Sequence, residues 1–112
     1  MYDVVKDIVR VERFVAARPR CNGVVITLTN EPSYWRPVTH GRDTNAAAFR
    51  LYEGVELAGT RVWGPNTGAG TMRGRADALT LVGRHRLTWR DYSRLRGRRG
   101  DFRALIVRIE ES

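Results

Sequence analysis

The N-terminal segment has the pattern of hydrophobic and polar positions that is typical of an amphipathic helix. From Tyr2 to Ala17, apolar residues recur at offsets of one, three and four positions, and charged residues fill most of the remaining positions. Asp3 lies in the first turn, where an acidic side chain suits the helix dipole, and Pro19 cannot continue a helix. The pattern therefore predicts a helix over this segment that buries one of its faces.

Runs of β-branched, aromatic and alternating residues predict the strands. Val24–Thr29 is too uniformly apolar for a strand with one solvated face, so we expect it to lie centrally and to be covered on both sides. Residues 102–109 alternate between two faces and are expected to close the sheet. Shorter runs predict two hairpins, Phe49–Tyr52 with Leu57–Trp63 through Glu53-Gly54, and Leu79–Val82 with Arg86–Trp89 through Gly83-Arg84-His85.

Two segments rich in glycine or proline predict loops. Residues 30–43 contain prolines on both sides of Tyr34 and Trp35, which favours an ordered loop anchored by these aromatic side chains. Residues 64–74 are rich in glycine and poor in apolar side chains, which favours a flexible loop. The elements together predict an α+β fold, with one N-terminal amphipathic helix packed on a mixed or antiparallel sheet of about five or six strands.

Length and composition limit the classes of protein to which this chain can belong. A chain of 112 residues supports one hydrophobic core, so residues 1–112 are predicted to form a single domain, and a two-domain enzyme is excluded. No apolar run is long enough to span a membrane, and charges interrupt the first segment where a leader peptide needs an apolar core. We therefore expect a cytoplasmic protein that has no membrane partner.

Few residues of this chain are suited to bind a metal. Cys21 is the only cysteine, so it cannot form an internal disulfide. Together with His40 and His85 it is spread too widely along the chain for the short ligand spacings of a zinc site. We expect a half-buried thiol, two surface imidazoles and no bound metal.

Arginine dominates the charge of the chain. The sequence has 20 Lys and Arg against 12 Asp and Glu, a net charge of +8, and residues 84–103 alone carry eight arginines and two aspartates, a charge of +6. Aromatic side chains interleave with these arginines, a mixture that suits phosphate contacts combined with base stacking. The predicted nucleic-acid-binding residues are Arg84, Arg86, Arg90, Tyr92, Arg94, Arg96, Arg98 and Arg99. The alternative is that GC-rich coding produced a solvated arginine-rich segment, in which Trp89 points inward as a core anchor.

The polar face of the predicted helix has two interpretations. Asp3, Lys6, Asp7 and Arg10 are spaced so that they share one side of the helix. They can form exposed ion pairs worth a few tenths of a kcal/mol each, or they can line a metal-dependent phosphodiester site.

Several motifs resemble the C-terminal half of uncharacterised bacterial proteins that are similar to PD-(D/E)XK nucleases. The resemblance covers nearly the whole chain and is carried by Lys6-Asp7-Ile8-x-Arg10-x-Glu12, Leu28-Thr29-Asn30-x-x-Ser33-Tyr34-Trp35, Phe49-Arg50 with Gly54, Gly59 with Trp63, Trp89-x-Asp91-Tyr92-Ser93 and Phe102-Arg103. It implies that the chain corresponds to the C-terminal part of a longer nuclease-like protein. It also implies a site lined by Lys6, Asp7, Arg10, Asn30, Tyr34 and Trp35.

The resemblance lacks the catalytic signature. In such nucleases an upstream strand carries an acid and a (D/E)-x-K pair, which hold a divalent metal such as Mg²⁺. Lys6 is the only lysine of this chain, and Val4 stands where the acid is needed. The resemblance therefore implies no catalytic residue and no cofactor in these 112 residues, with a divalent metal expected only if N-terminal elements complete the site.

Three functions follow as hypotheses. The first is a nuclease-like domain without an intact catalytic centre that binds a nucleic acid, DNA more readily than RNA, through its arginines. The second is an interaction module, in which the exposed edge of an incomplete sheet pairs with a second copy or with a missing N-terminal partner. The third is an active metal-dependent nuclease, which requires Asp3, Asp7 or Glu12 to replace the missing carboxylates.

Overall fold

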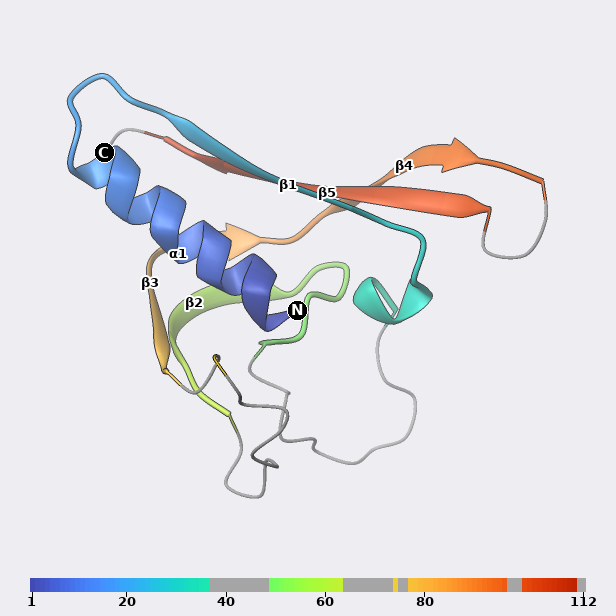
Figure 1. Ribbon diagram of the computed structural model, residues 1–112, viewed down its shortest axis with the longest axis horizontal. Coiled ribbons are helices and arrows are strands. Elements are labelled where there is room, and N and C mark those ends of the chain that lie inside the picture. Colours follow the sequence, from blue (N-terminus) through green and yellow to red (C-terminus); the bar gives the residue numbers. More distant parts are fainter. Residues whose placement is uncertain (37–48, 64–73, 75–76, 97–99, 111–112) are drawn as a thin grey trace.

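The computed structural model describes residues 1–36, 49–63, 74, 77–96 and 100–110 of the chain (Figure 1). Its described elements are one α-helix, one short 3-10 helix and five strands. In chain order they are α1 (Tyr2–Ala16), β1 (Gly23–Thr29), η1 (Pro32–Tyr34), β2 (Glu56–Arg61), β3 (Leu79–Arg86), β4 (Trp89–Arg94) and β5 (Asp101–Ile109). The predicted α+β fold with an N-terminal helix is confirmed, and all described strand pairs are antiparallel.

The helix α1 connects two separate sheets. It packs against β1 and β5 of a three-stranded sheet and against β3 of a two-stranded sheet, and Figure 1 shows it between them. Its apolar stripe joins residues of both sheets and of segment 49–51 in one core. The spacing of apolar residues that predicted the helix therefore also identified the face that is buried. None of the helices in the described ranges has the length and hydrophobicity needed to cross a membrane.

The three-stranded sheet has the order β1-β5-β4. The strand β5 lies in the middle, because it pairs with β1 from Gly23↔Ile109 to Thr29↔Arg103 and with β4 on its other side. The prediction that residues 24–29 form the central strand is therefore wrong, and so is the prediction that β5 closes the sheet. Val24, Ile26 and Leu28 are exposed by 49, 64 and 48%, so β1 is covered on one face only.

The two-stranded sheet and the segments around it differ from both predicted hairpins. Residues 79–86 form one continuous strand, β3, so Gly83-Arg84-His85 is not a turn. The partner of β3 is β2, and residues 50–52 are in no strand. Phe49 and Leu51 are instead fully buried side chains of the core. The predicted glycine-rich loop lies outside the described residues except for Gly74.

The chain passes from one sheet to the other at Leu87. The carbonyl of Leu87 accepts a hydrogen bond from the Gly54 N–H at 2.8 Å, and the Leu87 N–H donates to the carbonyl of Val55 at 2.8 Å. Just beyond, the Trp89 indole N–H donates to the carbonyl of Leu51 at 2.7 Å, and Trp89 is buried, as the alternative of a solvated arginine-rich segment with Trp89 as a core anchor expects. Segment 51–55 therefore supplies hydrogen-bond partners for the backbone of Leu87, which belongs to neither sheet, and for the indole N–H of Trp89.

Candidate functional site

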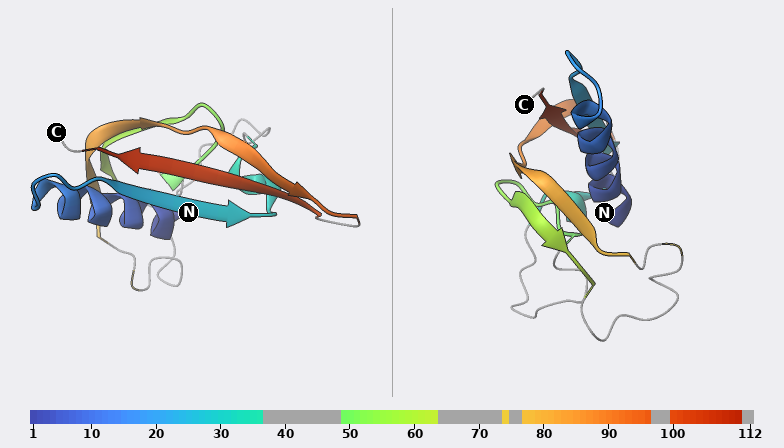
Figure 2. Two further views of the ribbon diagram at one scale, coloured as in Figure 1. Left: turned by 90° about the horizontal axis from the view of Figure 1, so that it is seen from above. Right: turned by 90° about the vertical axis from the view of Figure 1, so that its left-hand side faces the viewer.

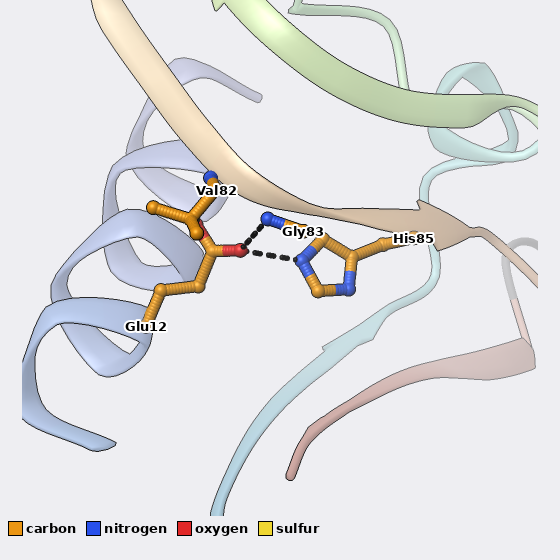
Figure 3. Close-up of polar contacts among 4 residues, drawn as sticks. All are labelled: Glu12, Val82, Gly83 and His85. Carbon is orange, nitrogen blue, oxygen red and sulfur yellow. Dashed lines mark hydrogen bonds and ion pairs between the residues drawn. The ribbon is translucent and has the colours of Figure 1, made fainter. Parts of the chain in front are cut away.

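A buried carboxylate joins α1 to β3. The Val82 N–H donates to Glu12 Oε1 at 3.0 Å, and the Gly83 N–H donates to Glu12 Oε2 at 2.7 Å. Nε2 of His85 lies 2.9 Å from the same Oε2 (Figure 3). A carboxylate can only accept, so Nε2 carries a hydrogen in this arrangement. The side chains of Glu12 and His85 are exposed by only 5 and 11%.

A bulge in β3 creates this arrangement. Leu57 pairs with His85 and Gly59 with Leu81, so three residues of β3 lie opposite one residue of β2. Successive N–H groups of a regular strand point in opposite directions, whereas a bulge can turn them to the same side. Glycine suits the position because a Cβ on Gly83 would lie 3.1 Å from Glu12 Oε2.

The geometry of the Glu12–His85 pair is that of an anchor. Three donors already occupy the two oxygens of Glu12, which leaves the carboxylate little capacity to act on a ligand. The pair does border a cavity of about 330 Å³, together with residues of β3 and β5 that include Arg84 and Arg108. We assign the pair to the fixation of α1 on the β3 bulge, because every contact of the carboxylate serves that purpose.

Sequence reasoning missed this pair. The expectation of two surface imidazoles is wrong for His85, and His40 lies outside the described residues. The signal was present, because Glu12 falls on the apolar stripe of α1 between Val9 and Val15. A carboxylate at such a position needs buried donors. The partner could not be found from sequence, because the bulge that supplies the donors is set by strand pairing.

The second notable feature is a two-stranded ribbon that projects beyond the end of β1. We call this ribbon, together with its base in the three-stranded sheet (residues 90, 91 and 103), the arginine arm and define it as residues 90–96 and 100–103. The pairing of β1 with β5 ends at Arg103, whereas β4 and β5 remain paired to Arg94↔Asp101, and the Leu95 N–H donates to the carbonyl of Gly100 at 2.8 Å. Figures 1 and 2 show this end of the ribbon extending away from α1 and the other sheet.

The side chains of the arm are largely exposed. Arg90, Arg94 and Arg96 are all exposed, and Tyr92 is exposed by 67% at a bulge in β4. Arg94 Nη2 lies 3.1 Å from Asp91 Oδ2, in an exposed ion pair. Such a pair holds an arginine only weakly, so its guanidinium can exchange to another anion.

The predicted nucleic-acid-binding residues fall into separate groups. Arg84 and Arg86 lie on β3, in the other sheet, where Arg84 Nη1 is 3.1 Å from Glu56 Oε1 and Arg86 pairs with Glu56 in the strand register. Arg90, Tyr92, Arg94 and Arg96 lie on the arm. Arg98 and Arg99 lie outside the described residues. The crossover at Leu87 therefore divides a run that is continuous in sequence.

Part of the predicted site lining meets along one side of the arm. A cavity of about 220 Å³ is lined by Asn30, Trp35 and Arg36, and by residues of the arm that include Arg103. The Arg103 guanidinium stands over the Trp35 ring, 4.9 Å from its centre. Tyr34 packs edge-on against Trp89, with ring centres 6.4 Å apart. The aromatic anchoring predicted for the loop is therefore confirmed for residues 30–36, and the rest of that loop lies outside the described residues.

The helix residues predicted for the same site lie elsewhere. Lys6, Asp7 and Arg10 belong to α1 and do not line the cavity beside the arm. Arg10 Nη1 lies 3.9 Å from Asp7 Oδ1 in an exposed ion pair. Within the described ranges, no group of three His, Cys, Asp or Glu side chains could hold a metal ion.

Comparison with protein-family models, with curated proteins and with solved structures finds no match to this chain. The resemblance to PD-(D/E)XK nucleases therefore stays a prediction.

Proposed function

We propose that this protein is a nucleic-acid-binding domain that contacts the phosphate backbone, of DNA more readily than of RNA, through the arginine arm. The observation that carries the proposal is the exposure of Arg94 and Arg96 on the part of the arm that projects beyond β1, and of Arg90 at its base. The nuclease-like resemblance supports the same class of partner. The proposal includes no catalytic step, because the (D/E)-x-K signature is missing from the sequence.

The shape and chemistry of the arm suit this partner. A two-stranded antiparallel ribbon is narrow enough to enter the major groove of duplex DNA. Guanidinium groups bind phosphate oxygens in charge-assisted, often bidentate hydrogen bonds. The exposed Tyr92 ring adds a surface on which an unpaired base can stack. The arm therefore offers a charge contact for any strand and a stacking contact for single strands.

Binding is measured by fluorescence anisotropy with labelled 20-nucleotide single-stranded DNA, duplex DNA and duplex RNA over a series of salt concentrations. The test variant is Arg90→Gln with Arg96→Gln, which leaves the Asp91–Arg94 pair intact. The plot of log K against log salt has a negative slope, and loss of two phosphate contacts should make this slope shallower by about 2. Duplex binding should also weaken about tenfold or more at low salt. Tyr92→Ala should weaken single-strand binding selectively.

The matched control is Arg13→Gln with Arg18→Gln, which removes the same charge from exposed positions at the C-terminal end of α1 and just after it. We expect the affinity of this control to stay within about twofold of the original protein, because only long-range charge is lost. Equal weakening by both double variants would mean that net charge alone, and not the arm, drives binding. No binding of any nucleic acid at low salt would reject the proposal.

A further inference from the structure

The outer edge of β1 lacks the features by which proteins usually protect an exposed strand. In the described part of the chain β1 pairs only with β5, so its other edge presents unpaired backbone groups. Its seven residues, Gly23–Thr29, include no charged residue and no proline, and its register with β5 has no bulge. Charges, prolines and bulges are the means by which edge strands avoid pairing with other chains.

We infer that this edge pairs with β1 of a second copy of the chain in an antiparallel dimer. The inference goes beyond nucleic-acid binding and does not depend on it. Pairing of all seven residues places the two-fold axis at the middle residue, Ile26. The dimer then has one continuous six-stranded sheet in the order β4-β5-β1-β1-β5-β4.

The side chains of β1 suit a copy of themselves. The two-fold axis sets Ile26 opposite Ile26 and Val24 opposite Leu28 on the exposed face. Pairs of apolar side chains across neighbouring strands are favourable. Val24, Ile26 and Leu28 of the two copies would then form one continuous apolar row on the exposed face of the joined sheet.

The distribution of charge also permits two copies to meet here despite the net charge of +8. The arginine arm is built on β4, at the opposite edge of the sheet from β1. Arg20 precedes β1 and Glu31 follows it, so the antiparallel arrangement brings Arg20 of each copy toward Glu31 of the other. The junction is therefore uncharged at its centre and has opposite charges at its ends.

The helix leaves room for this pairing. A Cβ built on Gly23 would lie within 3.2 Å of side-chain atoms of Val11 and Val15, so α1 is closest at the start of β1. Figures 1 and 2 both show the second half of β1 extending past α1. A strand added along this edge would lie beside β1 and above the helix. Because one strand pair is a small interface, we expect a dissociation constant in roughly the micromolar range.

Sedimentation velocity over a concentration series from about 5 to about 500 µM tests the dimer through mass action. We expect the original protein to shift from monomer to dimer, and Ile26→Lys to remain monomeric because two lysines would oppose each other on the axis. Val82→Lys is the matched control, since Val82 is a β-branched residue of β3 with 84% exposure. This control should dimerise like the original protein.

A charge exchange tests the register. Ile26→Glu should also be monomeric, and an equal mixture of Ile26→Lys and Ile26→Glu should form a dimer again, because the two residues face each other only if the axis passes at this position. Circular dichroism and the urea midpoint of each variant confirm that it folds. Should a charged variant fail to fold, Ile26→Cys in a Cys21→Ser background supplies the second readout, an air-oxidised covalent dimer that Val82→Cys does not give.

Three results would overturn the inference. The first is a protein that stays monomeric at all concentrations, which would leave the edge to a different partner. The second is a dimer that Ile26→Lys does not weaken. The third is a mixture of the two charged variants that remains monomeric. None of these results bears on the arginine arm, since the nucleic-acid assay uses variants on the opposite side of the sheet.

Discussion

Removal of the Glu12 carboxylate should be the most damaging single truncation of a polar side chain in the described part of this protein. In Glu12→Ala the N–H groups of Val82 and Gly83 and the Nε2–H of His85 all lose their acceptor. A hydrogen bond to a charged group contributes about 1.5–3 kcal/mol to the free energy of unfolding, and a buried donor left unpaired costs about 1–3 kcal/mol. These contacts are only partly buried, so water can replace some of them.

We therefore expect Glu12→Ala to lower the free energy of unfolding by about 3–5 kcal/mol. That is a large part of the 5–15 kcal/mol or so that stabilises a typical domain. It corresponds to a fall in melting temperature of roughly 12 °C or more. Glu12→Gln should lower the free energy of unfolding by about half as much. Its amide oxygen can still accept a hydrogen bond, but its amide nitrogen is a donor and would lie against another donor.

The measurement is urea unfolding followed by circular dichroism, with Glu56→Ala as the matched control. Glu56 is an exposed carboxylate on β2 that contacts Arg84, and its removal should cost no more than about 1 kcal/mol. Amide hydrogen exchange adds a local readout: the Val82 and Gly83 amides should lose protection in Glu12→Ala before the core strand β5 does. A loss of stability no greater than that of Glu56→Ala, or unchanged protection of these two amides, would refute the assignment of Glu12 as an anchor.

Two further substitutions test the packing around the anchor and the crossover by urea unfolding. Gly23→Ala should cost about 1–3 kcal/mol because the new methyl group would overlap the side chain of Val11. The double variant Gly23→Ala with Val11→Ala should lose less than the sum of the two single losses, and additive losses would contradict the overlap. Trp89→Phe should cost about 1–3 kcal/mol because it leaves the buried carbonyl of Leu51 without its 2.7 Å hydrogen bond, and a loss as small as that of Tyr92→Phe, an exposed control, would show that this bond contributes little.

Local pattern determined the elements whose character depends on their own residues. The helix was predictable because a stripe at helical spacing needs no particular neighbour to be recognised, and α1 ends within one residue of the predicted limit. The alternation of residues 102–109 likewise predicted β5, and the aromatic residues of segment 30–36 predicted a loop anchored in the core. The α+β class followed from the order of these elements.

Tertiary structure decided where each strand lies. An apolar run such as Val24–Thr29 is compatible with a central strand and also with an edge strand, because the residues of one strand do not indicate which other strands pair with it. A glycine such as Gly83 suits a turn as well as a bulge, and only the pairing with β2 and the contact with Glu12 select the bulge.

The same limit applies to the candidate sites. Arg84 and Arg90 are only six positions apart, yet the crossover at Leu87 places them in different sheets. Glu12 and His85 are 73 positions apart, and they meet because a bulge in one strand offers its N–H groups to a helix that packs across it. The sequence by itself determined which side chains are charged, apolar or aromatic, and it determined the helix at the N-terminus and the strand at residues 102–109. The pairing of strands determined which of these side chains share a surface, because hydrogen bonds between distant segments leave no local trace in the pattern.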